Sequence, residues 1–95
     1  MKAYWIAHVT VTDPTAYAEY QALGPAVFAA HGGKFLARGG ASETLEGPTL
    51  NRHVIIEFPD LAAAKACYTS PEYQQAKSHR LAAATAHVVI VEGLA

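Results

Sequence analysis

Four stretches of the chain have the apolar pattern of β-strands. Residues 3–12 and Arg52–Phe58 alternate with a period of two, and Thr85–Glu92 contains the apolar run VVIV. Lys34–Arg38 is a shorter candidate of the same kind. Side chains alternate between the two faces of a strand, so this period predicts strands with one face packed against a core.

Between these stretches the chain carries helix-start signals. Asp13-Pro14, Asp60 and Ser70-Pro71 each place a capping side chain before a helical run, and in two cases a proline follows at the first position. Aspartate and serine accept hydrogen bonds from free backbone amides, and proline loses nothing there by lacking an N–H. We therefore expect one helix after Asp13 and two consecutive helices after Asp60, the last with one stripe formed by Tyr73, Ala76, Lys77 and Arg80.

The first helix is expected to run to about Ala30 and to end at His31-Gly32-Gly33. Glycine there supplies the left-handed turn that closes a helix, and His31 is a C-terminal cap rather than a catalytic base. Gly24-Pro25 lies inside this helix and predicts a kink or a short break, because proline removes a backbone donor.

The resulting order is strand, helix, strand, strand, helix, strand. This order is that of the ferredoxin-like fold, an α+β fold with a four-stranded antiparallel sheet and its helices on one face. Gly39-Gly40 follows the second strand as a bulge or turn, and Ser42–Glu46 continues as an edge strand or a wide loop. Residues 1–95 are expected to form a single domain.

The face that the helices leave uncovered is too apolar to remain in water. Two sheets meeting through such faces would form a closed homodimer about a twofold axis. The side chains that alternation places on this face are Tyr4, Ile6, His8, Ile55, Glu57, Val89 and Val91.

Composition narrows the possible partners. Seven basic and eight acidic residues give a net charge of −1, which attracts neither nucleic acid nor a membrane surface. No secretion signal or membrane span is indicated, so we expect a cytoplasmic protein. The single cysteine, Cys67, lies in an alanine-rich stretch and is expected to be a buried packing residue.

Several longer motifs resemble one known family. They include GGKFLARGG at residues 32–40, LEG at 45–47, IIEFPD at 55–60 and YTSPEYQ at 68–74, followed by Arg80. With these motifs the chain resembles the small bacterial proteins called domain of unknown function 1330, in the dimeric α+β barrel superfamily. The resemblance implies a homodimer of ferredoxin-like subunits and no settled activity. The family often has a tryptophan where this chain has Cys67.

Related barrels place substrate between the sheet and its helices, and this resemblance directs the search for a site. Arginine suits a carboxylate, and a nearby carboxylate could act as a base. The structural alternative is that the same groups form a cap, core contacts and an ion pair of Glu57 with Arg38 or Arg80. By strict alternation Glu57 also lies away from the helices. The candidate ligand-binding residues are Arg38, Glu57, Tyr68, Ser70, Tyr73 and Arg80.

No metal or cofactor is expected. His8, His53 and His87 share strand positions on one inferred face, which is one way to build a metal site. They come from three strands without local ligand spacing, however, so we expect no such site. Gly39-Gly40 lacks the lysine and the following helix of a phosphate-binding loop.

Two functions of different classes remain open at this point. The first is a homodimer that binds, or binds and transforms, a small organic acid or aromatic metabolite between sheet and helices. There Arg38 and Arg80 would hold the anion, Glu57 would orient or abstract a proton, and the tyrosines would wall the pocket. The second is a non-enzymatic homodimer with a structural or regulatory role. Convergent polar groups around a pocket would favour the first, and a filled interior would favour the second.

Overall fold

The computed structural model describes residues 1–94. Its sheet has four antiparallel strands in the order β2-β3-β1-β4, which confirms the predicted ferredoxin-like fold. The elements in chain order are β1 (Ala3–Val11), α1 (Pro14–Ala30), β2 (Lys34–Arg38), β3 (Arg52–Phe58), α2 (Leu61–Thr69), α3 (Pro71–Ala83) and β4 (Ala84–Glu92).

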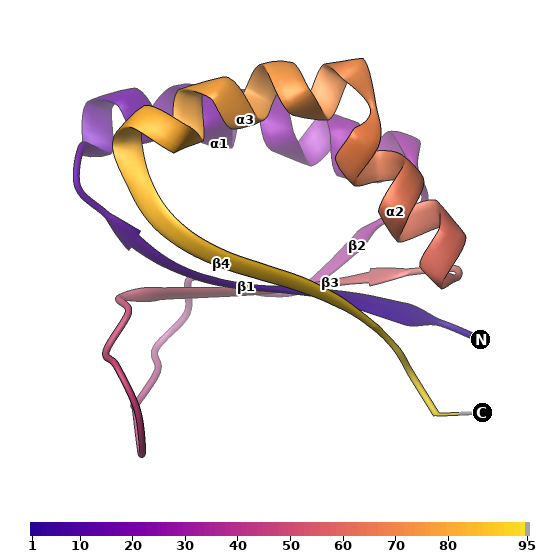
Figure 1. The fold of residues 1–95 in the computed structure, drawn as a ribbon, viewed down its shortest axis with the longest axis horizontal. Coiled ribbons are helices and arrows are strands. Elements are labelled where there is room, and N and C mark those ends of the chain that lie inside the picture. Colours follow the sequence, from indigo (N-terminus) through magenta and orange to yellow (C-terminus); the bar gives the residue numbers. More distant parts are fainter. Residues whose placement is uncertain (95) are drawn as a thin grey trace.

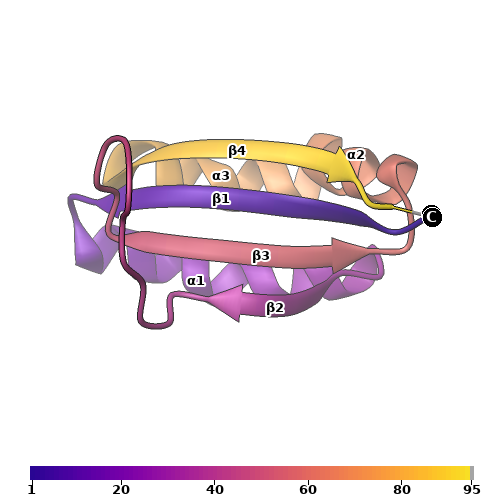
Figure 2. The same cartoon turned by 90° about the horizontal axis from the view of Figure 1, so that it is seen from below.

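The three helices lie on one face of the sheet (Figure 1). Seen through the sheet, α1 lies behind β2 and β3, while α2 and α3 lie behind β1 and β4 (Figure 2). The opposite face carries no helix, as the alternation predicted. Residues 39–51 form a loop without strand structure that hangs below this open face, so the loop is the correct alternative for Ser42–Glu46.

The predicted helix caps are confirmed. The side chains of Asp13 and Asp60 accept hydrogen bonds from the amides of Ala16 and Ala63. At the other end of α1, the ring Nδ1 of His31 lies 3.1 Å from the carbonyl oxygen of Val27. Free backbone groups at both ends of the helix are thereby satisfied within the chain.

Two details differ from the expectation. Helix α1 continues through Gly24-Pro25, so the short break that was one predicted alternative is absent, while the other alternative, a kink, stays a prediction. Strand β4 begins at Ala84, one residue before the predicted Thr85, and directly follows α3. Tertiary packing around a long helix holds it together across a proline that would end a helix in isolation.

The core is built around Trp5 on β1. Its ring lies 5.1 Å from the ring of Phe28 and 5.0 Å from that of Tyr73, in both cases edge to face. Trp5, Tyr73 and Phe58 are at most 1% exposed. Because aromatic rings bury large areas and prefer edge-to-face contacts, this cluster fixes α1 and α3 over the sheet.

Within residues 1–94, none of the helices is both long and apolar enough to cross a membrane.

Candidate functional site

A cavity of about 360 Å³ lies between α1 and the helix-covered face of the sheet. The backbone of α1 lies close to that of α3, whereas it makes few close contacts with the backbone of the strands. The helix therefore stands off from the sheet, and side chains only partly fill the space. The residues that line the cavity are Trp5, Ala7, Val9, Tyr17, Tyr20, Gln21, Gly24, Pro25, Phe28, Phe35, Arg38, Arg52, Val54, Ile56, Arg80, Ala86 and Val88.

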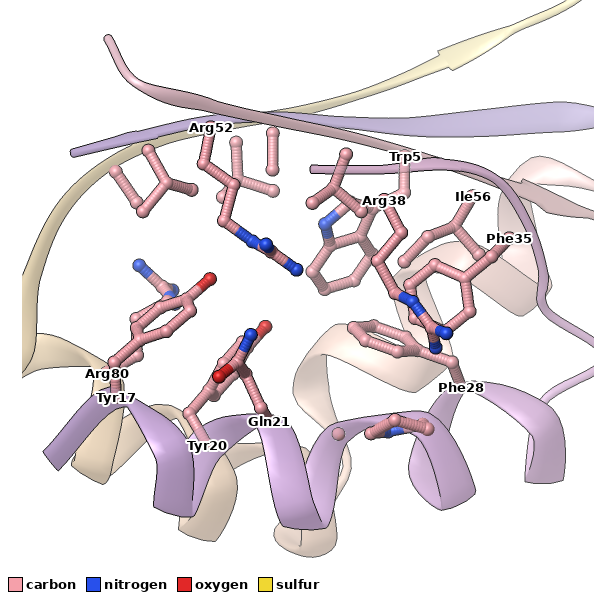
Figure 3. A pocket seen from close by; sticks show the side chains of 17 residues that line it. Trp5, Tyr17, Tyr20, Gln21, Phe28, Phe35, Arg38, Arg52, Ile56 and Arg80 are labelled. Carbon is pink, nitrogen blue, oxygen red and sulfur yellow. The ribbon is translucent and has the colours of Figure 1, made fainter. Parts of the chain in front are cut away.

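Three of these lining residues are arginines and none is acidic. Arg80 is only 6% exposed, and the Nε atoms of Arg80 and Arg52 are buried without a hydrogen-bond partner among the described residues. Arg80, Arg52 and Arg38 approach the cavity from different elements (Figure 3). A buried charge without a counter-charge is costly, so this cavity is electrostatically suited to an anion.

A β-bulge brings Arg38 to the cavity face. Phe35 pairs with Ile56 and Arg38 pairs with Val54, and the register shifts between Phe35 and Ala37. In a regular strand, residues three apart point to opposite faces. One extra residue in β2 restores both side chains to the same face, and bulges often re-aim a side chain in this way.

Arg52 is held by the turn that follows β2. A side-chain carbon at Gly39 would collide with Nη1 of Arg52, and Gly39 has φ +70°, in the left-handed region that glycine tolerates. The Cζ atom of Arg52 also lies 5.9 Å from the ring centroid of Tyr17. Arg52 is thus packed between a glycine backbone and an aromatic ring, and its Nε atom has no hydrogen-bond partner within residues 1–94.

Two tyrosine hydroxyls meet beside Arg80. The hydroxyl oxygens of Tyr20 and Tyr73 are 2.9 Å apart, and the Cζ atom of Arg80 lies 5.6 Å from the centroid of the Tyr20 ring. Burial raises the pKa of both hydroxyls, and the neighbouring Tyr73 raises that of Tyr20 further. At neutral pH both groups therefore keep their protons and serve as hydrogen-bond partners, not as bases.

The structure separates Glu57 from the arginines. Glu57 pairs with Tyr4 across the sheet on the open face, and its Oε1 atom lies 3.3 Å from Nζ of Lys2. Among the described residues, neither the ion pair of Glu57 with Arg38 or Arg80 nor a pocket shared by them is formed. Strict alternation along β3 is the physical reason, because the cavity opens on the helix-covered face.

Of the other candidates, Arg38 and Arg80 line the cavity, whereas Tyr68, Ser70 and Tyr73 do not. Ser70 caps α3, accepting from the Tyr73 amide and donating to the carbonyl of Cys67. The Tyr68 hydroxyl accepts a 2.8 Å hydrogen bond from Nζ of Lys77. Tyr73 is fully buried in the core. These three residues support the cavity from behind.

The main residue that sequence reasoning missed is Arg52. It lies two residues before Val54 and four before Ile56, so the alternation that assigned those two to the helix-covered face also assigns Arg52 to it. The sequence therefore contained a signal for Arg52, namely a charged residue on the strand face that is otherwise apolar and buried. Tyr17 and Tyr20 carried no such signal, because aromatic residues on a helix stripe usually form core.

The three histidines form a row across the open face. His8 pairs in register with both His53 and His87, and the Nδ1 atoms of His8 and His53 are 2.8 Å apart, as in a hydrogen bond. A hollow lies between this row and residues 42–50 of the loop. Within residues 1–94, no group of three or more histidine, cysteine or acidic side chains is arranged to hold a metal ion.

Cys67 is fully buried, as expected of a packing residue. Burial raises the pKa of its thiol to about 11. The reactive form of a cysteine is the thiolate, so Cys67 is unreactive at neutral pH.

Solved structures share this fold. A protein of unknown function from Rhodopseudomonas palustris is 26% identical, with a TM-score of 0.77 over 99% of this chain and 83% of that one. A dimeric protein of unknown function with a ferredoxin-like fold, from Bacteroides fragilis, is 17% identical, with a TM-score of 0.65 over 97% and 96% of the two chains. SnoaB, a cofactor-independent oxygenase from Streptomyces nogalater, is 19% identical, with a TM-score of 0.67 over 99% and 94%.

No functionally curated protein matches the sequence. A family model does match, over residues 2–94, and it confirms the resemblance seen in the sequence motifs. The chain belongs to the family described as "Domain of unknown function (DUF1330)".

Proposed function

We propose that the protein binds a small organic acid in the cavity between α1 and the sheet, with the acid group between Arg52 and Arg80. The observation that carries this proposal is that Arg52 and Arg80 both line a cavity with no acidic lining residue, while the Nε atom of each is buried without a hydrogen-bond partner among the described residues. A carboxylate would supply the missing acceptors and the missing negative charge. Hydrogen bonds between guanidinium and carboxylate are among the strongest in proteins.

The rest of the cavity favours an apolar or aromatic ligand body. Trp5, Phe28 and Phe35 line the cavity beyond Arg52 (Figure 3), and the rings of Phe28 and Phe35 meet edge to face at 5.6 Å. Ligand sites commonly combine such apolar walls with a few convergent polar groups, and a volume of about 360 Å³ is within their usual range. An aromatic ring would pack on these walls while its carboxylate reached the arginines.

The proposal is for binding, without an assigned reaction. The titratable groups that line the cavity are arginines and tyrosines, and the raised pKa of Tyr20 keeps its hydroxyl protonated at neutral pH, so it is not available to accept a proton. Glu57, the base that the sequence proposed, lies on the other face of the sheet. The oxygenase at 19% identity shares the fold alone, and a shared fold does not carry a reaction with it.

Benzoate and benzamide test the proposal as a matched pair, because they have the same ring and differ in charge. Trp5 lines the cavity and is the only tryptophan of the chain, so its fluorescence should report occupancy, with calorimetry as an independent readout. We expect saturable binding of benzoate and binding of benzamide that is weaker by about tenfold or more. Equal affinity for the two compounds, or binding of neither, contradicts the proposal.

We also propose that the open face of the sheet is covered by a second copy of this chain. Val89 and Val91 on that face are 54% and 46% exposed, and Ile6 and Ile55 lie beside them. Contiguous apolar surface of this kind is typical of an interface. The similar Bacteroides fragilis protein is described as dimeric, which supports the same arrangement here.

Gly39→Ala should weaken benzoate binding by displacing the guanidinium of Arg52. The new methyl group would collide with Nη1 of Arg52, and alanine would also be strained at φ +70°. We expect a loss of about 1–2 kcal/mol in unfolding free energy from the strain, together with about tenfold weaker binding of benzoate. Thermal unfolding and calorimetric titration measure the two effects.

Two other glycines distinguish the effect of backbone strain from the effect of the collision with Arg52. Gly47 has φ +88° but nothing within 4 Å of the position where a side-chain carbon would be added, so Gly47→Ala should cost stability without affecting binding. Gly40 has neither feature, and Gly40→Ala should change neither property. If Gly39→Ala and Gly47→Ala have the same effect on benzoate, the contact between Gly39 and Arg52 does not position the arginine.

A further inference from the structure

Arg38 remains without a role once the acid group is assigned to Arg52 and Arg80. It lines the same cavity, and its Cζ atom lies 4.7 Å from the ring centroid of Phe35. It forms no ion pair within residues 1–94, where the recorded pair joins Lys2 and Glu57. Its guanidinium is therefore a third positive charge in the cavity lining, on an exposed residue that has no ion-pair partner among the described residues.

The position of Arg38 is set by a specific feature of the backbone. Without the extra residue in β2, Arg38 would point to the open face, whereas in the structure it is an exposed residue that lines the cavity. The bulge instead directs it to the cavity. A bulge interrupts the sheet ladder, and such features occur near sites where a side chain must be re-aimed. The geometry of β2 thus favours a role for Arg38 in contacting a ligand.

Arg38 and Arg80 lie on opposite sides of Trp5 (Figure 3). Arg80 is beside the ring of Tyr20, whereas Arg38 is stacked on the ring of Phe35. With the Trp5 ring between the two arginines in this view, we expect one compact acid group to contact only one of them. A single carboxylate between Arg52 and Arg80 would also leave an excess of positive charge in the lining. A second anionic group at the Arg38 end would reduce that excess.

We propose that the natural ligand is an aromatic acid with two anionic groups at opposite ends of a planar body. One group lies between Arg52 and Arg80, the ring packs beside Trp5, and the second group is bound by Arg38. This inference rests on the proposed function and adds the class of ligand to it. Arg38 is then the residue that discriminates between aromatic dianions and monoanions of similar shape.

Terephthalate and para-toluate provide the test. Both have a carboxylate on a benzene ring, and the group opposite to it is a second carboxylate in terephthalate and a methyl group in para-toluate. We expect the wild-type protein to bind terephthalate about tenfold or more tightly than para-toluate, by calorimetry at fixed ionic strength. In Arg38→Met the ratio of the two affinities should fall to near one.

Lys34→Met is the matched control. Lys34 is exposed on the same strand and pairs with Glu57 on the open face. Its replacement by methionine therefore removes one positive charge that lies outside the cavity. The terephthalate preference should persist in this variant. Equal affinities in the wild-type protein, or a preference that survives Arg38→Met, would overturn the inference while leaving the proposed function intact. Binding of neither acid would overturn the proposed function and the inference with it.

Discussion

Arg80→Met is expected to weaken benzoate binding by about 10- to 100-fold while leaving the folded protein at least as stable as the wild type. The two effects have opposite signs for the same physical reason. In the free protein, Arg80 is a cation that is only 6% exposed and has no acidic partner among the described residues. Methionine keeps most of the packing of the aliphatic stem and removes the buried charge.

The stability part of this prediction distinguishes a ligand-binding residue from a structural one. Replacing buried charges by apolar side chains of similar size is often neutral or stabilising by about 1–4 kcal/mol. The contact of Arg80 with the Tyr20 ring offsets part of that gain, because a cation over an aromatic ring contributes about 0.5–2 kcal/mol. Denaturant unfolding of the ligand-free protein measures the balance.

Two variants complete the experiment. Lys77→Met removes a positive charge one turn earlier on α3, where Lys77 contacts Tyr68 outside the cavity, and should leave benzoate binding nearly unchanged. Arg80→Lys keeps the charge but loses the planar fork, so it should bind benzoate more tightly than Arg80→Met and more weakly than the wild type. A large loss of stability in Arg80→Met with unchanged benzoate affinity would make Arg80 a structural residue.

The two faces of each strand are the part of this structure that the sequence predicted best. Successive side chains of a strand point to opposite faces, so the sequence alone shows which residues share a face. This alternation correctly separated Val54 and Ile56 from Ile55 and Glu57. The helix caps were predicted equally well, because the side chains of Asp13, Asp60 and Ser70 bind backbone amides only three residues further along the chain. Local rules of this kind do not depend on the rest of the chain.

The cavity could not be predicted in the same way. Its volume depends on how far α1 stands off from the sheet, which is decided by packing against α3. Arg38 reaches the cavity only through the bulge in β2, and no residue pattern in KFLAR marks the extra position. The alternation of side chains along β3 also places Arg52 on the helix-covered face. A binding role for this charge can be inferred, however, only when a cavity is known to lie there.

The alternation of side chains also predicted the apolar open face of the sheet. The second prediction with a large expected effect concerns the dimer formed through this face. Across β3, β1 and β4 the register aligns Ile55, Ile6 and Val89 in one continuous apolar row. The histidine row lies on one side of it, and a row of Glu57, Tyr4 and Val91 on the other. A twofold interface would bury the central row against its own copy.

Val89→Asp should therefore convert a dimer into a monomer. Val89 is 54% exposed in the single subunit, so aspartate there is accommodated in water and leaves the subunit folded. In the dimer the same carboxylate would be buried in an apolar row without a partner, once in each subunit. We expect the dissociation constant to rise by about 100-fold or more, measured by sedimentation equilibrium across micromolar concentrations.

Leu81→Asp is the control, because Leu81 is 64% exposed on α3, on the side of the molecule away from the open face. It adds the same charge at another exposed apolar position and should leave the dimer intact. A wild-type protein that sediments as a monomer at these concentrations would contradict the assignment of the open face. So would equal effects of the two substitutions, since a dimer formed elsewhere would not distinguish Val89 from Leu81. A selective effect of Val89→Asp would mean that the apolar row is buried between subunits, and that the cavity on the opposite face of each sheet remains free for a ligand.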